Sequence, residues 1–176
     1  MKELFKVFKH SAYRIESLPN YKVNSEEKDY FNFINGQPVK YGDKDWIKEL
    51  NQWQKDGKKI KRIRVISEEL TSYEKYEFNC YHENFLAGEE IKVLPRSIYE
   101  NLVKKADRFD FWIFDEKYMC KLNYDSHGTF LGSLRIEKNI NKYIEIFNLL
   151  ESKTLFDYTE IAKQINNYKV KINFNF

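Results

Sequence analysis

Apolar residues recur at helical spacing in three segments of the first half of the chain. In the first of these segments, Tyr30, Phe31 and Ile34 make a short apolar face. Each segment starts at a side chain that can accept hydrogen bonds from the first helical N–H groups, which is the usual sign of a helix start. The predicted helices begin at Asn24, Asp43 and Thr71 and end near Gly36, Gly57 and Asn84.

The strands are predicted from short apolar or alternating runs bounded by turn residues. In one such run Ile63 and Val65 lie on one side, while Arg62, Arg64 and Ile66 lie on the other. Three further runs, separated by short polar turns, predict an antiparallel meander. The predicted strands are 59–67, 91–94, 111–114, 118–124 and 129–136, and further helices are predicted at 97–106, capped by Ser97, and at 140–150. This order predicts an α+β fold, with a mixed or mostly antiparallel sheet, a three-stranded meander and flanking helices, and not a regular βαβ winding.

The pattern restarts after Lys153. Thr154 is expected to cap a last helix, and the tail alternates apolar residues with Lys and Asn, which predicts a final strand with one buried face. The apolar positions of this tail are Val170, Ile172, Phe174 and Phe176. We therefore expect a single domain over residues 1–150, with a helix–strand extension over 151–176 packed on it. Because the tail is so apolar, we expect it to dock on the chain's own sheet edge or on a second copy of the chain. The more specific form of this expectation is a homodimer that forms through the C-terminus.

Composition favours one globular core without a strongly basic surface. The chain has 176 residues, of which 42% are hydrophobic and 17% aromatic, so a core can be built from few large side chains. The formal net charge is +3, well short of the basicity typical of a dedicated duplex-DNA binder. A phosphate-bearing ligand stays possible if the positive charge is clustered.

Cysteine usage and the absence of long apolar runs predict a cytoplasmic protein. Cys80 and Cys120 are far apart and read as reduced, buried thiols. No phosphate-binding, dinucleotide-binding or zinc-binding motif occurs, so neither a metal nor a cofactor is expected. The first residues lack the apolar run of a signal peptide, and no stretch approaches the ~18 apolar residues of a membrane span, so no membrane partner is expected.

The first candidate site lies near the start of the chain. His10, Arg14 and Glu16 are spaced so that an extended chain places them on one face, and a helix still makes His10 and Arg14 neighbours. An imidazole beside a guanidinium suits an anion. The alternative is a surface ion pair of Arg14 with Glu16 or Glu3, and the sequence does not decide between the two.

A basic run crosses a turn into the strand at 59–67. Such a run is more typical of a solvated face, but it is also a candidate nucleic-acid contact through Lys58, Lys59, Lys61 and Arg62. Arg64 differs, because it lies inside a strand expected to be buried. An unpaired buried guanidinium is costly, so we predict that Arg64 is buried against a carboxylate. The candidate partners are Glu68, Glu77 and Asp110.

Two junctions next to predicted strands could also hold an anion. Ser67 and Tyr73 flank a helix start, where free N–H groups bind phosphates well, although Glu68 can cap that end itself. Arg96 follows a short strand, and Asp110 precedes a buried one. Asp110 either faces a cleft or caps a turn, and the turn cap is the commoner arrangement.

The same segments occur together in a known family. The motifs, as they stand in this sequence, are His10–Glu16, Arg62–Tyr73, Leu94–Arg96, Asp110–Asp115 and Tyr124–Gly128. In their order and spacing they resemble a bacterial domain family of unknown function that is common in actinobacteria and often encoded near helix-turn-helix regulators. The resemblance covers roughly residues 5–136 and implies no reaction and no catalytic residues. The chain departs from the family in being richer in Lys, Asn and aromatic residues and in carrying the C-terminal extension.

The leading hypothesis is a regulatory or mobile-element-associated protein that binds a phosphate-bearing ligand or nucleic acid. Its anion site would use His10, Arg14, Arg64 and Arg96. A second hypothesis is an enzyme acting on a nucleotide or nucleic acid, with His10 as acid or base beside Glu68 or Asp110 and with arginines stabilising the developing charge. A third is a module that binds a regulatory protein through its aromatic surface and its C-terminal strand. Convergence of the candidate residues in one pocket would favour the first two hypotheses.

Overall fold

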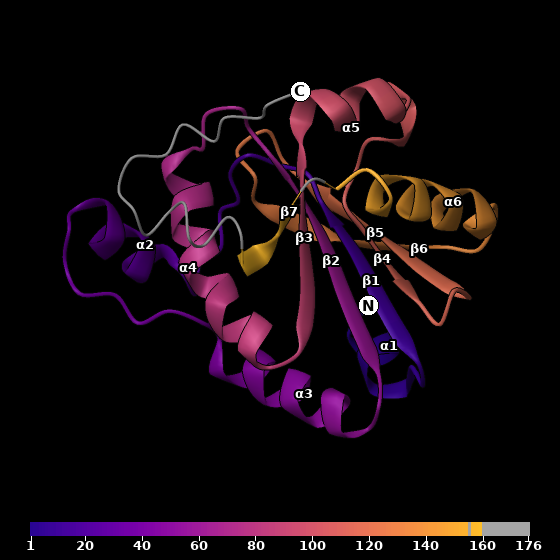
Figure 1. Cartoon of the computed structure of the whole chain (residues 1–176), viewed down its shortest axis with the longest axis horizontal. Coiled ribbons are helices and arrows are strands. Elements are labelled where there is room, and N and C mark those ends of the chain that lie inside the picture. The colour runs from indigo at the N-terminus through magenta and orange to yellow at the C-terminus, as the bar shows by residue number, and fades with distance from the viewer. Residues whose placement is uncertain (155, 160–176) are drawn as a thin grey trace.

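A mixed β-sheet with helices on both faces forms the protein (Figure 1). The computed structural model describes residues 1–154 and 156–159. The strand order is β6-β5-β4-β1-β2-β3-β7. The strands are β1 (Ser11–Glu16), β2 (Lys59–Ile66), β3 (Glu89–Pro95), β4 (Phe111–Phe114), β5 (Tyr118–Tyr124), β6 (Phe130–Ile136) and the two-residue β7 (Phe156–Asp157). The helices are α1 (Lys2–Val7), α2 (Glu27–Ile34), α3 (Lys44–Lys55), α4 (Ser72–Leu86), α5 (Arg96–Leu102), the 3-10 helix η1 (Lys105–Asp107) and α6 (Ile140–Glu151).

The predicted α+β class is confirmed, and so is the antiparallel meander β4–β5–β6. The centre of the sheet, however, is parallel: β1 pairs with β2, and β2 pairs with β3, in the same direction. Parallel neighbours need a long crossover, and α2 with α3 supplies one while α4 supplies the other. The segment β2–α4–β3 is therefore a βαβ unit, which the sequence pattern did not predict.

The two faces of the sheet bury different sets of side chains. The face covered by α1, α3 and α4, here called the α4 face, buries Leu50, Trp53 and Phe78 from the helices. The opposite face, here called the α6 face, packs Ile15, Ile63 and other strand residues against α5 and α6. Because alternate strand residues point to opposite faces, the predicted division of β2 into an apolar row and an arginine-bearing row is confirmed.

Several predicted boundaries shift in the structure. α2 begins at Glu27 without a side-chain cap from Asn24, and Phe31 and Ile34 are exposed at 60% and 53% rather than buried. α5 begins at Arg96, one residue before the predicted cap. Neither α1 nor β1 as a definite strand was predicted.

Near the C-terminus the strand β7 follows Thr154, where the start of a helix was predicted. The rest of the predicted last helix and the alternating tail, 160–176, lie outside the described residues. Within residues 1–154 and 156–159, no helix has the length and apolar character needed to cross a membrane.

A carboxylate ties the turn between β4 and β5 to the start of β1. Asp115 accepts hydrogen bonds from the backbone N–H groups of Lys9, His10 and Ser11 at 2.7–2.9 Å. These three hydrogen bonds outweigh the effect of partial burial and hold the pKa of Asp115 below its usual range. The three N–H groups are 104–106 residues away along the chain, so the clamp fixes β1 between its two neighbours.

The start of α4 provides the first test of the fold. Thr71 and Glu74 form the predicted capping box, in which each side chain accepts the backbone N–H of the other residue. We expect Thr71→Ala to lower the free energy of unfolding by about 1 kcal/mol, because the Glu74 N–H loses its acceptor. Urea titration of both proteins measures the difference. Ser72→Ala, one position along, is the matched control and should change stability by less than about 0.5 kcal/mol.

Candidate functional site

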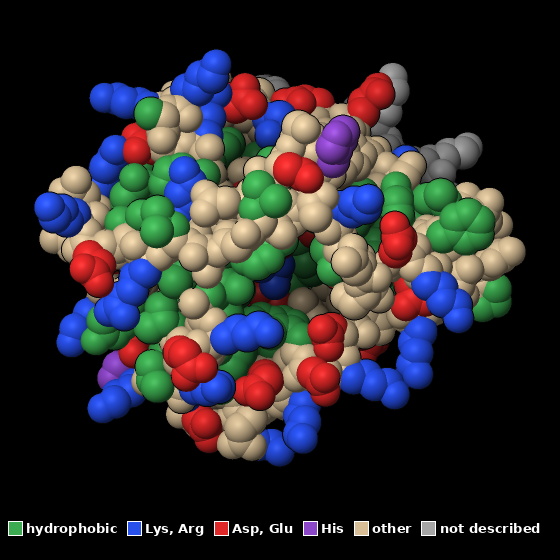
Figure 2. All heavy atoms as spheres, turned by 180° about the vertical axis from the view of Figure 1, so that it is seen from behind, with side chains coloured by type: hydrophobic (Ala, Val, Ile, Leu, Met, Phe, Trp, Pro, Cys, Tyr) green, Lys and Arg blue, Asp and Glu red, His purple; other side chains and the backbone are tan. Residues whose placement is uncertain are grey.

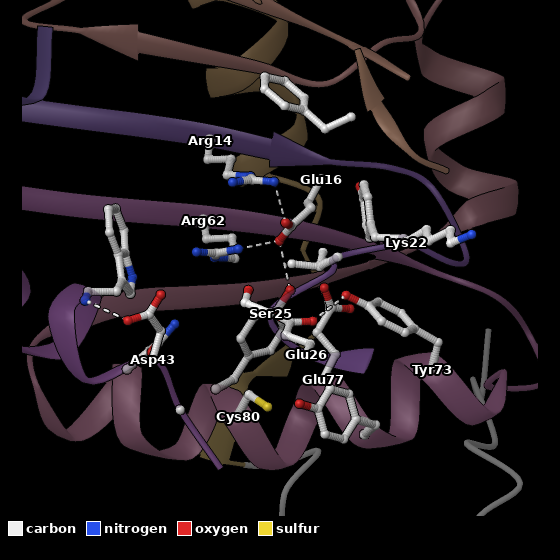
Figure 3. Close-up of a pocket in the computed structure, with 18 of the residues that line it drawn as sticks. Arg14, Glu16, Lys22, Ser25, Glu26, Asp43, Arg62, Tyr73, Glu77 and Cys80 are labelled. Carbon is white, nitrogen blue, oxygen red and sulfur yellow. Dashed lines mark hydrogen bonds and ion pairs between the residues drawn. The ribbon is translucent and has the colours of Figure 1, made fainter. Parts of the chain in front are cut away.

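The centre of the α4 face carries charged side chains on neighbouring strands. The parallel register places Arg14 beside Arg62 and Glu16 beside Arg64. Residues two apart on a strand share a face, so all four side chains point to the same side. Figure 3 shows Arg14, Glu16 and Arg62 projecting from β1 and β2 toward α4. The sheet thus brings three arginines and a carboxylate together below the helices.

Glu16 is the common acceptor of this group. Its Oε1 lies 2.5 Å from Arg14 NH2, and its Oε2 accepts from Arg62 NH1 and from the Tyr81 hydroxyl, the latter at 2.7 Å. Glu16 is 4% exposed. Burial alone would raise its pKa, but Arg14 and Arg62 outweigh burial and hold the pKa of Glu16 well below its usual range. Glu16 is therefore ionised at neutral pH.

Arg62 and Arg64 each have a second carboxylate partner. Arg62 Nε donates to Glu89 at 2.8 Å, and Arg64 Nε donates to Glu77 at 2.7 Å. Arg64 is 0% exposed, so the prediction that it is buried against a carboxylate is confirmed, with Glu77 as the partner. Burial raises the pKa of Glu77 above the ordinary carboxyl range, although Arg64 opposes the shift.

Other predicted site residues hold the backbone of the segment 17–21. Arg64 NH1 donates to the Leu18 carbonyl at 2.7 Å, and Arg96 NH2 donates to the Ser17 carbonyl at 2.8 Å. Asp110 accepts from the Ser17 N–H and hydroxyl and from the Tyr21 hydroxyl. Asp110 is 2% exposed, and this burial raises its pKa. These residues are the support of a loop, not groups that face a cleft.

The loop that they hold forms one wall of a cavity. The cavity has a volume of about 740 Å³ and lies between the α4 face of the sheet and the segments around α2 and α4. Seen from behind, the molecule is hollowed near the middle, with basic and acidic atoms at the base of the hollow and hydrophobic side chains around it (Figure 2). Its lining is rich in aromatic rings: Phe5, Tyr21, Trp46, Tyr73, Tyr76, Tyr81, Trp112, Tyr124 and Phe130.

Two buried N–H donors of the lining have no acceptor among the described residues. They are Arg14 Nε and Trp46 Nε1. Both side chains adjoin the same ring, because the Arg14 guanidinium lies 5.5 Å from the Trp112 ring centroid and the Trp46 ring lies 5.9 Å from it. A buried donor left without an acceptor costs ~1–3 kcal/mol. The cavity wall is therefore prepared for an acceptor atom beside Trp112.

The opposite wall presents a carboxylate. Glu26 precedes α2, lines the cavity and accepts a hydrogen bond from the Tyr73 hydroxyl at 3.0 Å. It takes part in none of the ion pairs of the described residues, and burial raises its pKa despite the Tyr73 hydrogen bond. Figure 3 shows Glu26 and Tyr73 across from Arg14.

The structure brings only part of the predicted anion site together. Arg14 and Tyr73 line the cavity, and Arg64 contacts the lining residues Glu77 and Tyr21. His10 is exposed beside Asp115 and does not line the cavity. The remaining predicted ligands, Ser67 and Arg96, donate to Glu74 and to the loop backbone. The candidate catalytic residue Glu68 accepts from the Ser97 N–H at the start of α5.

The basic run divides between the two faces of the sheet. Lys59 is exposed, Lys58 lies over the Phe8 ring, and Lys61 pairs with Glu151 at 2.8 Å. Arg62, which was grouped with them as a surface contact, is 6% exposed and bound to two carboxylates. This is a correction: a run of charges along a strand alternates between faces, so it does not form one surface.

Cavity residues outside the predicted sites include Trp46, Trp112, Glu26, Tyr81 and Tyr124, of which Trp112 and Tyr124 lie within the family motifs. The aromatic residues had been assigned to the core, and their spacing does not distinguish a core from a cavity wall. The signal for Trp112 in the sequence is its place in the motif Asp110–Asp115, and the structure sets it beside Arg14 through the pairing of β4 with β1. The sequence does not predict this pairing, because the segment around Arg14 is compatible with either a strand or a helix.

Comparison with known proteins identifies the family. Neither the curated proteins nor the solved structures contain a match to the sequence. Within the part of the chain that the structure describes, no group of three His, Cys, Asp or Glu side chains is arranged to hold a metal ion. The family described as Domain of unknown function (DUF6879) matches residues 1–154, which include every strand of the sheet except β7 and all residues of the cavity. The chain therefore belongs to the DUF6879 family of domains of unknown function.

Proposed function

We propose that the protein binds a small ligand in the cavity and holds an oxyanion of that ligand, a phosphate or a carboxylate, at Arg14 and Trp46. The observation that carries the proposal is the pair of buried donors, Arg14 Nε and Trp46 Nε1, that adjoin Trp112 without an acceptor among the described residues. Both are donor-only groups, so they are satisfied by an acceptor on a ligand.

The dimensions and lining of the cavity support this proposal. A volume of about 740 Å³ is that of an ordinary small-molecule site, and such sites combine apolar walls with a few directed polar groups. The aromatic side chains offer flat surfaces for a planar ligand. Arg62 and Arg64 are held by carboxylates, so the oxyanion is held by directed N–H groups rather than by a large excess of positive charge.

A sensing role follows more directly than a catalytic one. The proposed catalytic residue His10 lies away from the cavity, and its proposed partners Glu68 and Asp110 are engaged with backbone and hydroxyl groups. A domain that binds a ligand without an acid–base pair of residues beside it is better suited to sensing the ligand and passing the signal to a protein partner. Its cysteines, Cys80 and Cys120, are free, which suits the reducing conditions of the cytoplasm.

Nucleic-acid binding is the weaker alternative. Of the four basic residues assigned to it, Lys58 and Lys59 are free of carboxylate partners in the described ion pairs. Two phosphate contacts give a shallow dependence of affinity on salt. Figure 2 also shows acidic and basic side chains interspersed over one face of the molecule.

The indole N–H signal of Trp46 in a proton–nitrogen NMR spectrum tests the proposal. Inorganic phosphate, acetate and adenosine 5′-monophosphate are titrated, and Trp46→Phe, which keeps an aromatic ring and removes the N–H donor, assigns the signal. We expect at least one probe to shift this signal, and Arg14→Met to weaken that binding by about tenfold, because a charged hydrogen bond is lost.

Arg135→Met is the matched control, since the Arg135 side chain is half exposed on β6 and does not line the cavity. It should leave the titration unchanged. If no probe shifts the Trp46 signal at millimolar concentration, or if Arg14→Met and Arg135→Met behave alike, the proposal is wrong.

A further inference from the structure

The cavity has two chemically different walls. One wall presents the unpartnered donors of Arg14, on β1, and Trp46, on α3, beside Trp112 of β4. The wall around α2 and α4 presents the Glu26 carboxylate and the hydroxyl of Tyr73. Figure 3 shows Glu26 and Tyr73 on the side of the cavity opposite Arg14. A ligand that spans the cavity therefore meets donors at one end and an acceptor at the other.

Among the carboxylates of the cavity lining, only Glu16 and Glu77 have cationic partners in the ion pairs of the described residues. Glu26 is the unpaired one that is hydrogen-bonded to a ring hydroxyl of the lining. Glu16 is bound by two arginines, and Glu77 is bound by Arg64. Asp43 is engaged as the N-cap of α3, where it accepts from two backbone N–H groups. Among the residues that the structure describes, the hydrogen bond that the Glu26 carboxylate accepts comes from the neutral Tyr73 hydroxyl. The Glu26 carboxylate is partly removed from water without the cationic partner that Glu16 and Glu77 have.

The surroundings of Glu26 favour a positively charged or N–H-bearing group. The rings of Tyr21, Tyr73 and Tyr76 lie near one another and line the same part of the cavity. The faces of aromatic rings attract cations, and a carboxylate beside them accepts the hydrogen bonds of an ammonium or amino group. The same wall would repel a second oxyanion.

We infer that the ligand of this cavity is bifunctional, with an oxyanion held by Arg14 and Trp46 and an ammonium or amino group held by Glu26. The inference rests on the proposed function and adds the second recognition element. Free amino acids with a planar side chain and nucleotides with an amino-substituted base share this chemistry. The volume of the cavity accommodates either kind of molecule.

Two sets of matched compounds distinguish these sources. The first set keeps an indole ring: L-tryptophan has both groups, tryptamine has the amine alone, and indole-3-propionate has the acid alone. The second set compares adenosine and inosine 5′-monophosphates, of which only the first has an amino group on its base. Affinities are measured by isothermal titration calorimetry on the full chain.

In at least one set we expect the bifunctional compound to bind about tenfold more tightly than its partner that lacks the amino group. Glu26→Gln should abolish this advantage and leave the affinity of the acid-only compound unchanged. Trp46→Phe should weaken the acid-bearing compounds and leave tryptamine unchanged. Glu27→Gln, which alters the neighbouring residue outside the cavity lining, should have no effect.

Tyr73→Phe guards against a merely structural effect of Glu26, because it removes the hydrogen bond to Glu26 but keeps the carboxylate. The preference for the bifunctional compound should persist in this variant. If the acid-only compounds bind as tightly as the bifunctional ones, or if Glu26→Gln leaves their ratio unchanged, the inference is wrong while the proposed function stands. If none of the compounds binds, both are wrong.

Discussion

Replacing Arg64 by methionine should lower the free energy of unfolding by about 3–5 kcal/mol. Arg64 is 0% exposed, donates to Glu77 at 2.7 Å and also supports the Leu18 carbonyl. The variant leaves the Glu77 carboxylate buried without a cation and a loop carbonyl without its donor. A loss of this size is a large part of the stability of an ordinary domain, so urea titration should show an obvious shift of the midpoint.

Two further variants identify the cause of this loss. Lys59→Met removes an exposed cation from the same strand and should change stability by less than about 0.5 kcal/mol. The double change of Arg64 to methionine and Glu77 to leucine should recover part of the loss, because it removes the stranded charge together with its partner. A stability of Arg64→Met within about 0.5 kcal/mol of the unaltered protein would show that the ion pair does not hold the core together.

Replacing Glu16 by glutamine should have an effect of comparable size at neutral pH. Glu16 accepts from Arg14, Arg62 and Tyr81, so the neutral amide leaves two buried guanidinium groups with less compensation. We expect a loss of about 3 kcal/mol or more, measured by urea titration at pH 7. Glu90→Gln, an exposed carboxylate on β3, is the control and should be nearly neutral.

The same pair of proteins predicts a dependence on pH. The pKa of Glu16 is lowered in the folded state, so the unfolded chain binds the proton more readily. The stability contributed by Glu16 is therefore complete above its unfolded pKa of about 4.3 and is lost as the pH falls through the folded pKa. Glu77 and Asp110 have raised pKa values, so their contributions run in the opposite direction.

Comparison of the unaltered protein with Glu16→Gln separates Glu16 from these opposing groups. The difference in stability between the two proteins should shrink as the pH is lowered from 5 to about 3. A difference that stays constant over this range would mean that the effect of the variant is steric and does not come from the ionised carboxylate.

Local patterns predicted the elements whose signals lie within one segment. The cap at Asp43 and the capping box at Thr71 depend on residues three or fewer positions apart, and both are confirmed. The alternation in β2 predicted the buried row that includes Arg64, and the cost of an unpaired charge predicted its carboxylate partner. These inferences needed only the local spacing and the energetic cost of burial.

The cavity could not be predicted in this way, because its two walls come from segments far apart in the sequence. Arg14 faces the cavity because β1 pairs with β2 in parallel and with β4 in the opposite direction, and no local pattern fixes these pairings. Arg96 was a candidate anion ligand and Asp110 a candidate catalytic partner, yet both support the backbone of the loop at 17–21. The polar side chains that hold a loop backbone are of the same types as those that form a ligand site. Only their positions in the folded protein show which of the two roles they have.

The clamp formed by Asp115 has a consequence for the order in which the chain folds during synthesis. The strand β1 emerges from the ribosome early, but both of its partners, β2 and β4, are made later, and Asp115 follows β4 directly. Until residue 115 has been translated, the edge of β1 that will face β4 stays open, and so does the cavity wall that Trp112 completes. Such long-range pairing slows folding. A nascent chain arrested before residue 110 should therefore be a target for chaperones that bind exposed strands, and release should follow the synthesis of β4.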